Sequence, residues 1–336
     1  MSAKQTSRWQ ILTKLRFWDH SSTDHAREPV SSHRRSLQPR ILCWIVTAAI
    51  LVGASVYVRA EIHRRIAHLE NRSAIGYIPS GGTLLIAGGG PLSEMIRHRF
   101  IELAGGPAAK IVVIPAEEID DQSRGQYREM WLRYGVNSVD VLHTTSRKLA
   151  NDPEFSQVLE SATGVWLGGG QQTWLAMWYG GTLIESRLKG VLGRNGVIGG
   201  TSAGAAIMSG VMIAGGRGTP VIGQGFDLIP DAVIDQHFVK RNRIGRLYQV
   251  LEQHPDLVGF GIDEATALQY SIKTGHFQVL GQSCVVACVM DVGNESPAKF
   301  RLQFLNPGDE FDIRRLRRGE QVQPAFTDFD AVLFGE

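Results

Sequence analysis

The chain has 336 residues, a formal net charge of +2, 43% hydrophobic residues and 20% charged residues. These values are ordinary for a folded globular protein and exclude both a disordered chain and a protein that crosses a membrane many times. A net charge so close to neutral also gives no reason to expect nucleic-acid binding.

The N-terminal part of the chain has the features of a membrane anchor. A basic tail at 1–40 precedes an uncharged run at 41–58, ILCWIVTAAILVGASVYV, which is about the shortest length that spans a bilayer as a helix. Arginines flank this run on both sides, as at the head-group interfaces of a bilayer. The tail is too long for an ordinary signal peptide, so we expect an uncleaved single-pass transmembrane helix. A linker at 59–80 then leads to one α/β domain at 81–336, which we expect on the exported side of the membrane.

Strand and helix patterns alternate after the linker. Continuous apolar strands separated by helices are typical of a doubly wound, mostly parallel sheet with helices on both faces. From about residue 275 the sequence is rich in strands, which predicts edge strands or a further sheet. Most glycine clusters fall at strand ends, where ligands bind in such folds. The patterns predict strands at 83–87, 111–115, 138–142, 164–167, 197–198, 232–234 and 258–262, and helices at 92–104, 126–134, 153–161 and 174–190.

The segment 200–204, Gly-Thr-Ser-Ala-Gly, matches the G-x-S-x-G motif between a strand and a helical stretch. This is the context of a nucleophile elbow, in which the serine stands on a sharp turn and glycines avoid Cβ clashes. Ser202 is therefore the predicted nucleophile. The amide of Ala203 is placed to bind an oxyanion, and the amides of Gly169 and Gly170 can supply a second donor. The alternative is a small-residue turn that only packs a helix on the sheet, but the strand–turn–helix context favours the nucleophile.

A serine nucleophile needs a general base, and histidine is the usual one at neutral pH. His237 follows the predicted strand at 232–234, and His143 also follows a strand end, so position alone does not exclude it. The cations after His237 can form either a solvated helix face or a binding site for carboxylates, which arginine binds in a forked geometry. These cations are Lys240, Arg241, Arg243 and Arg246.

A carboxylate should hold the imidazole in the correct tautomer. Asp263 and Glu264 follow the glycine-containing strand at 258–262 and are the candidates, although the pair can also be a surface acidic turn. The order serine, histidine, acid along the chain differs from the order in α/β-hydrolases. It therefore argues against the fold in which the G-x-S-x-G motif is most common.

Over about 82–270 the chain resembles the cyanophycinase and dipeptidase E family of serine peptidases. The segments that carry the resemblance are 199–205, 235–238 with the arginines that follow, and 261–267. The resemblance implies a fold like that of class I glutamine amidotransferases, with serine in place of cysteine. It implies a catalytic triad of Ser202, His237 and Glu264. It also implies substrate-binding roles for Gln171, Asp235, Gln236, Arg241, Arg243 and Arg246.

The spaced arginines are more similar to cyanophycinases than to dipeptidase E. Cyanophycinases hydrolyse multi-L-arginyl-poly-L-aspartate to β-aspartyl-arginine dipeptides, so the resemblance implies acyl transfer without a metal or organic cofactor. Gly170 stands where cyanophycinases often carry Asp. The alternatives are a dipeptidase for N-terminal aspartyl peptides and a membrane-tethered binding module without activity. The expected partners are an aspartyl-containing peptide or polymer, a membrane and a second copy of the chain in a homodimer.

Overall fold

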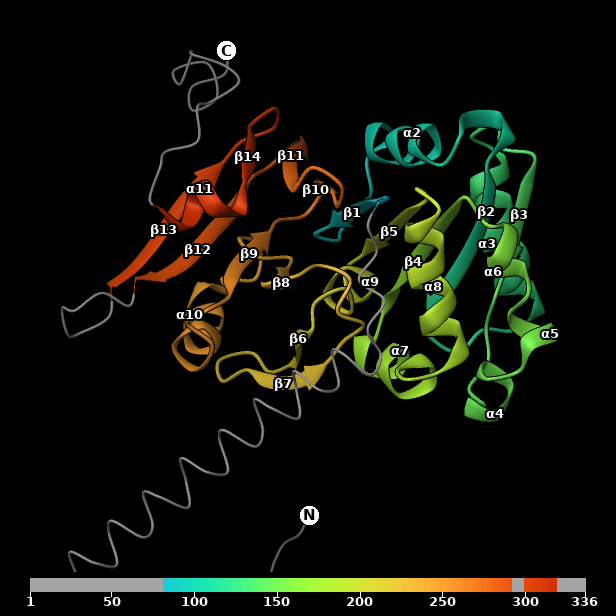
Figure 1. The fold of residues 1–336 in the computed structure, drawn as a ribbon, viewed down its shortest axis with the longest axis horizontal. Coiled ribbons are helices and arrows are strands. Elements are labelled where there is room, and N and C mark those ends of the chain that lie inside the picture. The colour runs from blue at the N-terminus through green and yellow to red at the C-terminus, as the bar shows by residue number, and fades with distance from the viewer. Residues whose placement is uncertain (1–80, 292–298, 319–336) are drawn as a thin grey trace, which may run out of the picture. The chain divides into compact units, whose positions relative to one another are not determined.

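The apolar strands assemble into an eight-stranded sheet among the described residues, in the order β14-β11-β10-β1-β5-β4-β2-β3 (Figure 1). The computed structural model describes residues 81–291 and 299–318. The parallel strands are β1 (Thr83–Ala87), β5 (Val197–Thr201), β4 (Gly164–Gly170), β2 (Lys110–Ala116) and β3 (Ser138–Val141). Beyond β1 the sheet continues antiparallel through β10 (Thr266–Ser271), β11 (His276–Gly281) and β14 (Glu310–Asp312).

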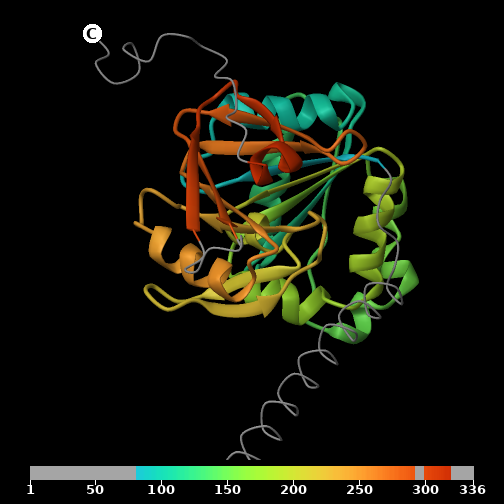
Figure 2. The same ribbon diagram turned by 60° about the vertical axis from the view of Figure 1, so that its left-hand side comes forward.

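Helices cover both faces of this sheet (Figures 1 and 2). Successive side chains of a strand point to opposite faces, so Leu84 and Ile86 join one core cluster and Leu85 and Ala87 join the other. The second face carries α2 (Glu94–Leu103), a 3-10 turn (Gly106–Ala108) and α3 (Asp121–Leu132). The first face carries α4 (Arg147–Ala150), α5 (Pro153–Ser156), α6 (Val158–Ser161), α7 (Gln172–Tyr179), α8 (Leu183–Gly193) and α9 (Ala203–Ala206).

A second, four-stranded sheet has the order β13-β12-β9-β8. Helix α10 (Ile244–Gln253) packs on it through Leu247 and Val250, which form a cluster with Val233 and Val286. A hairpin follows α9, and α11 (Ile313–Arg317) follows β14. The sheet contains β8 (Ala232–Gln236), β9 (Val258–Ile262), β12 (Val285–Asp291) and β13 (Lys299–Leu305), and the hairpin contains β6 (Val211–Gly215) and β7 (Val221–Gln224).

The predicted mixed α/β fold with a large central sheet and flanking helices is confirmed. The prediction of a mostly parallel sheet holds for the five neighbouring strands β1, β5, β4, β2 and β3. It does not hold for β10, β11 and β14, which pair antiparallel. Strands β8 and β9, which pair in parallel, lie in the second sheet instead. The helix expected at 126–134 begins earlier, because Asp120 caps it by accepting a 2.8 Å hydrogen bond from the Ser123 amide.

The predicted basic tail, membrane span at 41–58 and linker lie outside the described residues and stay predictions. Among residues 81–291 and 299–318, no helix is both long enough and apolar enough to cross a bilayer. The described residues all belong to one unit, Ile75–Glu336. All residues of the candidate site described below therefore lie within this unit.

Candidate active site

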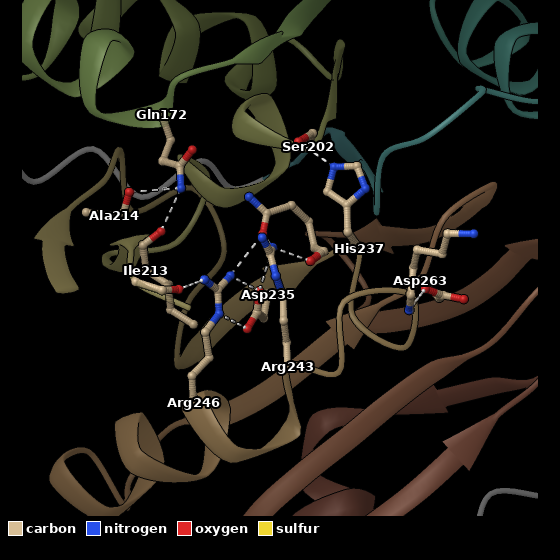
Figure 3. A network of polar contacts seen from close by, with 12 residues as sticks. Gln172, Ser202, Ile213, Ala214, Asp235, His237, Arg243, Arg246 and Asp263 are labelled. Carbon is tan, nitrogen blue, oxygen red and sulfur yellow. Dashed lines mark hydrogen bonds and ion pairs between the residues drawn. The ribbon is translucent and has the colours of Figure 1, made fainter. Parts of the chain in front are cut away.

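Three side chains from three different strand ends form one hydrogen-bonded line. Ser202 follows β5, His237 follows β8 and Glu264 follows β9. The Ser202 Oγ atom lies 2.9 Å from His237 Nε2, and His237 Nδ1 lies 2.7 Å from Glu264 Oε1 (Figure 3 shows the first contact). Because the carboxylate accepts from Nδ1–H, Nε2 is left as the acceptor for the serine hydroxyl.

The backbone at Ser202 is strained in the way a nucleophile elbow requires. Its φ of 53° and ψ of −108° lie in a region that side-chain-bearing residues rarely adopt. A Cβ on Gly200 would lie 2.4 Å from the Gly204 carbonyl oxygen, and one on Gly204 would lie 2.1 Å from the Leu167 carbonyl oxygen. Both flanking glycines of the motif are therefore sterically required, because each backbone approaches another one closely.

The end of β1 holds the three segments that carry this line. Consecutive backbone carbonyls of β1 and the following turn accept one hydrogen bond from each segment. Ser202 N donates to Ala87 O at 3.0 Å, His237 N donates to Gly88 O at 2.7 Å, and Ala265 N donates to Gly89 O at 3.0 Å.

The glycines after β1 also make room for the side chains of the line. A Cβ on Gly89, whose φ is +104°, would lie 2.4 Å from His237 Cε1. A Cβ on Gly90, whose φ is +68°, would lie 2.9 Å from Glu264 Cβ. The role of this turn is not evident from the sequence alone, although three glycines directly after a buried strand are a signal of close backbone approach.

The residues expected to supply the oxyanion donors have different neighbours. A Cβ on Gly169 would lie 3.9 Å from Ser202 Cβ, so Gly169 faces the nucleophile. Gly170 packs toward β2 instead, because its Cβ would lie 2.4 Å from the Ala116 carbonyl oxygen. Ala203 is the first residue of α9, directly after Ser202. Gln171 is exposed, and its amide donates to Ala116 O at 2.8 Å.

Asp235 and Arg246, both expected to bind substrate, are engaged with each other. Asp235 is completely buried and Arg246 is 4% exposed. Arg246 Nε donates to Asp235 Oδ2 at 2.7 Å, Nη2 donates to Oδ1, and Nη1 donates to Gly216 O at 2.5 Å. All three nitrogens of this guanidinium therefore donate to other residues of the protein.

Arg243 and Arg241 are placed differently from Arg246. Arg243 Nη1 donates to the backbone oxygen and to the side-chain oxygen of Gln236, each at 2.5 Å. The described residues offer no partner to its other two nitrogens. Arg241 is exposed. Both guanidinium groups act on His237 through their charge and have donors available to a bound anion; Figure 3 shows Arg243 within the network.

The surroundings of His237 hold its imidazole neutral. Burial lowers the pKa of His237 below its ordinary value, and the positive charges of Arg241 and Arg243 lower it further. The hydrogen bond and charge of Glu264 oppose these effects but do not cancel them. At neutral pH the ring is therefore ready to accept a proton.

The structure distinguishes between His143 and His237, which are both candidate bases by their positions in the sequence. His143 follows β3 and lies edge-on to Trp178, with 5.3 Å between ring centroids. Its Nδ1 atom is buried without a hydrogen-bond partner among the described residues. His237, in contrast, contacts both a serine and a carboxylate. His237 is thus the histidine of the candidate site.

A serine, an imidazole and a carboxylate in one line are the arrangement of a serine hydrolase. Residues 83–277 match the sequence model of Peptidase family S51. The chain belongs to peptidase family S51 and is a serine-type peptidase. The family resemblance seen in the sequence motifs is thereby confirmed.

Similar proteins include cyanophycinases and a peptidase of known structure. The chain is 31% identical over 280 residues to a cyanophycinase of Synechococcus elongatus, which covers 75% of this chain and 87% of that protein. It is 33% identical over 241 residues to a cyanophycinase of a Nostoc species, covering 65% and 80% respectively. The crystal structure of a peptidase from an acI-B1 Actinobacterium shares the fold, with a TM-score of 0.52, 23% identity, and coverage of 69% of this chain and 97% of that one.

Proposed function

We propose that the chain is a cyanophycinase-like peptidase that hydrolyses multi-L-arginyl-poly-L-aspartate to β-aspartyl-arginine dipeptides with Ser202, His237 and Glu264 as its catalytic triad. The observation that carries the catalytic part of this proposal is the continuous hydrogen-bonded line from hydroxyl to imidazole to carboxylate. The substrate is proposed from the similarity to cyanophycinases. The same proposal includes a fold like that of class I glutamine amidotransferases, with Ser202 in place of their cysteine.

The chemistry is acyl transfer in two halves. His237 takes the proton of Ser202, whose oxygen attacks the scissile carbonyl, and Glu264 stabilises the imidazolium that forms. The backbone amides of Ala203 and Gly169 hold the oxyanion: Ala203 directly follows the nucleophile, and the backbone of Gly169 passes close to Ser202. His237 then protonates the leaving amine. Water then attacks the acyl carbonyl and gives a proton to His237, which passes it to the serine oxygen as the acyl group leaves as a carboxylic acid.

Two features support an acidic, carboxylate-bearing substrate. The relatives at 31–33% identity are cyanophycinases. Arg241 and Arg243 lie beside His237 with donors that the described protein does not use. Guanidinium groups in such a position are suited to the free carboxylates of an aspartyl-arginine polymer.

The test is to incubate the full-length protein with cyanophycin and identify the soluble products by mass spectrometry. The wild type is expected to release β-aspartyl-arginine dipeptides. Ser202→Ala should lower the rate by a factor of about 10³ or more, because the triad acts as a unit. Ser186→Ala, the same change at an exposed position on α8, is the matched control and should keep the wild-type rate.

Two results contradict the proposal in different ways. Dipeptide release by Ser202→Ala at the wild-type rate would mean that another group is the nucleophile. A wild type that leaves cyanophycin intact but cleaves aspartyl dipeptides would replace the polymer substrate with a dipeptide while leaving the triad in place.

A further inference from the structure

Strand β13 forms one edge of the four-stranded sheet. It pairs antiparallel with β12 along its whole length of 7 residues, and no other strand of the described chain pairs with it. The outer edge of such a strand presents a row of backbone donors and acceptors, which proteins usually cover or blunt. The edge of β13 is therefore a place where another extended segment can add to the sheet.

Two large apolar side chains of this edge strand are exposed. Leu302 is 43% exposed and Phe304 is 58% exposed. Phe300 lies on the same face, because successive side chains of a strand alternate between faces. The Phe300 ring contacts Tyr248 of α10, with 5.0 Å between ring centroids. Helix α10 thus covers the beginning of this face, and the described residues leave Leu302 and Phe304 exposed as an apolar strip.

The opposite face of β13 lies against α11 and is basic. Leu305 belongs to the same core cluster as Leu316 of α11. Arg301, on the same face as Leu305, donates from Nη2 to the carbonyl oxygen of Arg317 at 3.1 Å. Three arginines at the end of α11 are exposed: Arg314, Arg317 and Arg318. The edge is therefore apolar on the side of α10 and cationic on the side of α11.

The C-terminal segment 319–336, which lies outside the described residues, has the composition that this edge requires. It follows α11, whose end is held beside β13 by the contact of Arg301. An extended residue spans about 3.3 Å, so half of this segment is enough to run along β13. The segment contains no Lys or Arg, and its acidic residues are Glu320, Asp328, Asp330 and Glu336. Its large apolar residues are Val322, Phe326, Phe329, Val332, Leu333 and Phe334.

Strand alternation sorts part of this segment into two different faces. In an extended chain Phe329 and Leu333 fall on one face, whereas Asp328, Asp330 and Val332 fall on the other. In a strand added to β13, the first face continues the apolar strip and the second brings both carboxylates to the side of the arginines. A shift by one residue would place the carboxylates over the apolar strip instead.

We propose that residues 326–334 add to the free edge of β13 as a further strand, with Phe329 and Leu333 over the apolar strip and Asp328 and Asp330 on the side of α11. Main-chain pairing, apolar burial and opposite charge all favour this docking. A second copy of the chain is a poorer occupant, because pairing two β13 edges puts two basic faces on the same side of one sheet. The docking is independent of the proposed peptidase function.

The test is hydrogen–deuterium exchange of the full-length protein in lipid nanodiscs, followed by mass spectrometry of the peptides that contain 299–305 and 326–334. In the wild type, 326–334 should exchange at least about tenfold more slowly than an isolated peptide of the same sequence, because sheet hydrogen bonds protect amides. Leu333→Asp places a charge over the apolar strip and should raise the exchange of both peptides about tenfold or more. Val332→Asp makes a similar change on the opposite face and should keep the protection.

A second variant tests the same contact from the side of β13. Phe304→Asp changes an exposed side chain, so the sheet should remain folded while 326–334 loses its protection. The peptides of β1 and β5 report the fold, and their exchange should stay at the wild-type rate in each variant.

Three results overturn the docking. Residues 326–334 of the wild type exchange as fast as the isolated peptide, or they stay protected in both Leu333→Asp and Phe304→Asp. In the third result, the protection of 299–305 falls as the protein is diluted, which means that a second copy occupies the edge.

Discussion

His237 lies between charges that act on it in opposite directions. Glu264 favours the protonated ring, whereas burial and the two nearby arginines favour the neutral ring and prevail. Only the neutral ring can take the proton of Ser202, so a lowered pKa extends activity toward acidic pH. The arginines proposed to receive the substrate thus also keep the base in its active form.

Replacing Arg241 should move the acidic limb of the reaction to higher pH. Without this positive charge the pKa of His237 rises, so more of the ring is protonated and inactive at a given acidic pH. The measurement is the rate at which an uncharged phosphonate modifies Ser202 in Arg241→Gln as a function of pH. An uncharged reagent is used because substrate carboxylates would bind the same arginine.

The neighbouring Lys240 provides the matched control for this shift. It is exposed, and its charge is not among those that shift the pKa of His237. Lys240→Gln should therefore leave the acidic limb in place. A limb that stays unchanged in Arg241→Gln, or moves to lower pH, would contradict the account of how the base is kept neutral.

At the scale of elements, the turn after β1 is the support of the site. Strand β1 lies between β10 and β5 in the large sheet. Its terminal carbonyls receive the amides of the segments that carry the nucleophile, the base and the acid. A Cβ on Gly89 would lie within 3.0 Å of three atoms of the His237 ring. Any side chain there should displace the ring from the line.

Gly89→Ala should abolish most activity without unfolding the chain. The added methyl group would stand 2.4 Å from His237 Cε1, and small misplacements of a base cost about 10²-fold in rate. Positive φ adds a strain of about 1–3 kcal/mol. The measurements are kcat/KM and the melting temperature.

Gly105→Ala isolates the clash from the backbone strain. Gly105 has a similar φ of +110°, but its Cβ would meet nothing within 4 Å. Both variants should lose stability through backbone strain, Gly89→Ala also through the clash, and only Gly89→Ala should lose activity. Equal activity in the two variants would show that the turn does not position the base.

The predictable elements were those with a local signature. Strands β1 and β2 were expected because they are short apolar runs that are buried on both faces. The β6–β7 hairpin was missed because β7 is largely exposed and lacks such a run. The sequences of β8 and β9 predict strands of the main sheet, because they are continuous apolar runs, and all their residues are buried. Membership in the second sheet depends on long-range pairing that no local pattern records.

At the scale of the whole molecule, the site unites two sheets. The large sheet supplies Ser202, and the four-stranded sheet supplies His237 and Glu264. One core cluster joins them, because Leu84 and Ile198 of the first sheet belong to the same cluster as Phe260 of the second. The geometry of the line is therefore maintained by the packing of both sheets.

This arrangement explains which parts of the site the sequence could reveal. Ser202 was predicted from a local motif, whereas the roles of His237 and Glu264 depended on a family resemblance. The resemblance implies a substrate-binding role for Arg246, but spacing along the chain does not show that it pairs with buried Asp235. The role of Gly89 depends on segments that meet only in the folded chain.

Mapping the modification by a serine-directed fluorophosphonate tests the central claim most directly. The wild-type protein should carry one adduct on the peptide that contains Ser202. His237→Ala should react at least about 10² times more slowly than the wild type, because the hydroxyl then lacks its base. An adduct on another residue, or a His237→Ala variant that reacts at the wild-type rate, would contradict the hydrogen-bonded line from Ser202 to Glu264 as the catalytic centre.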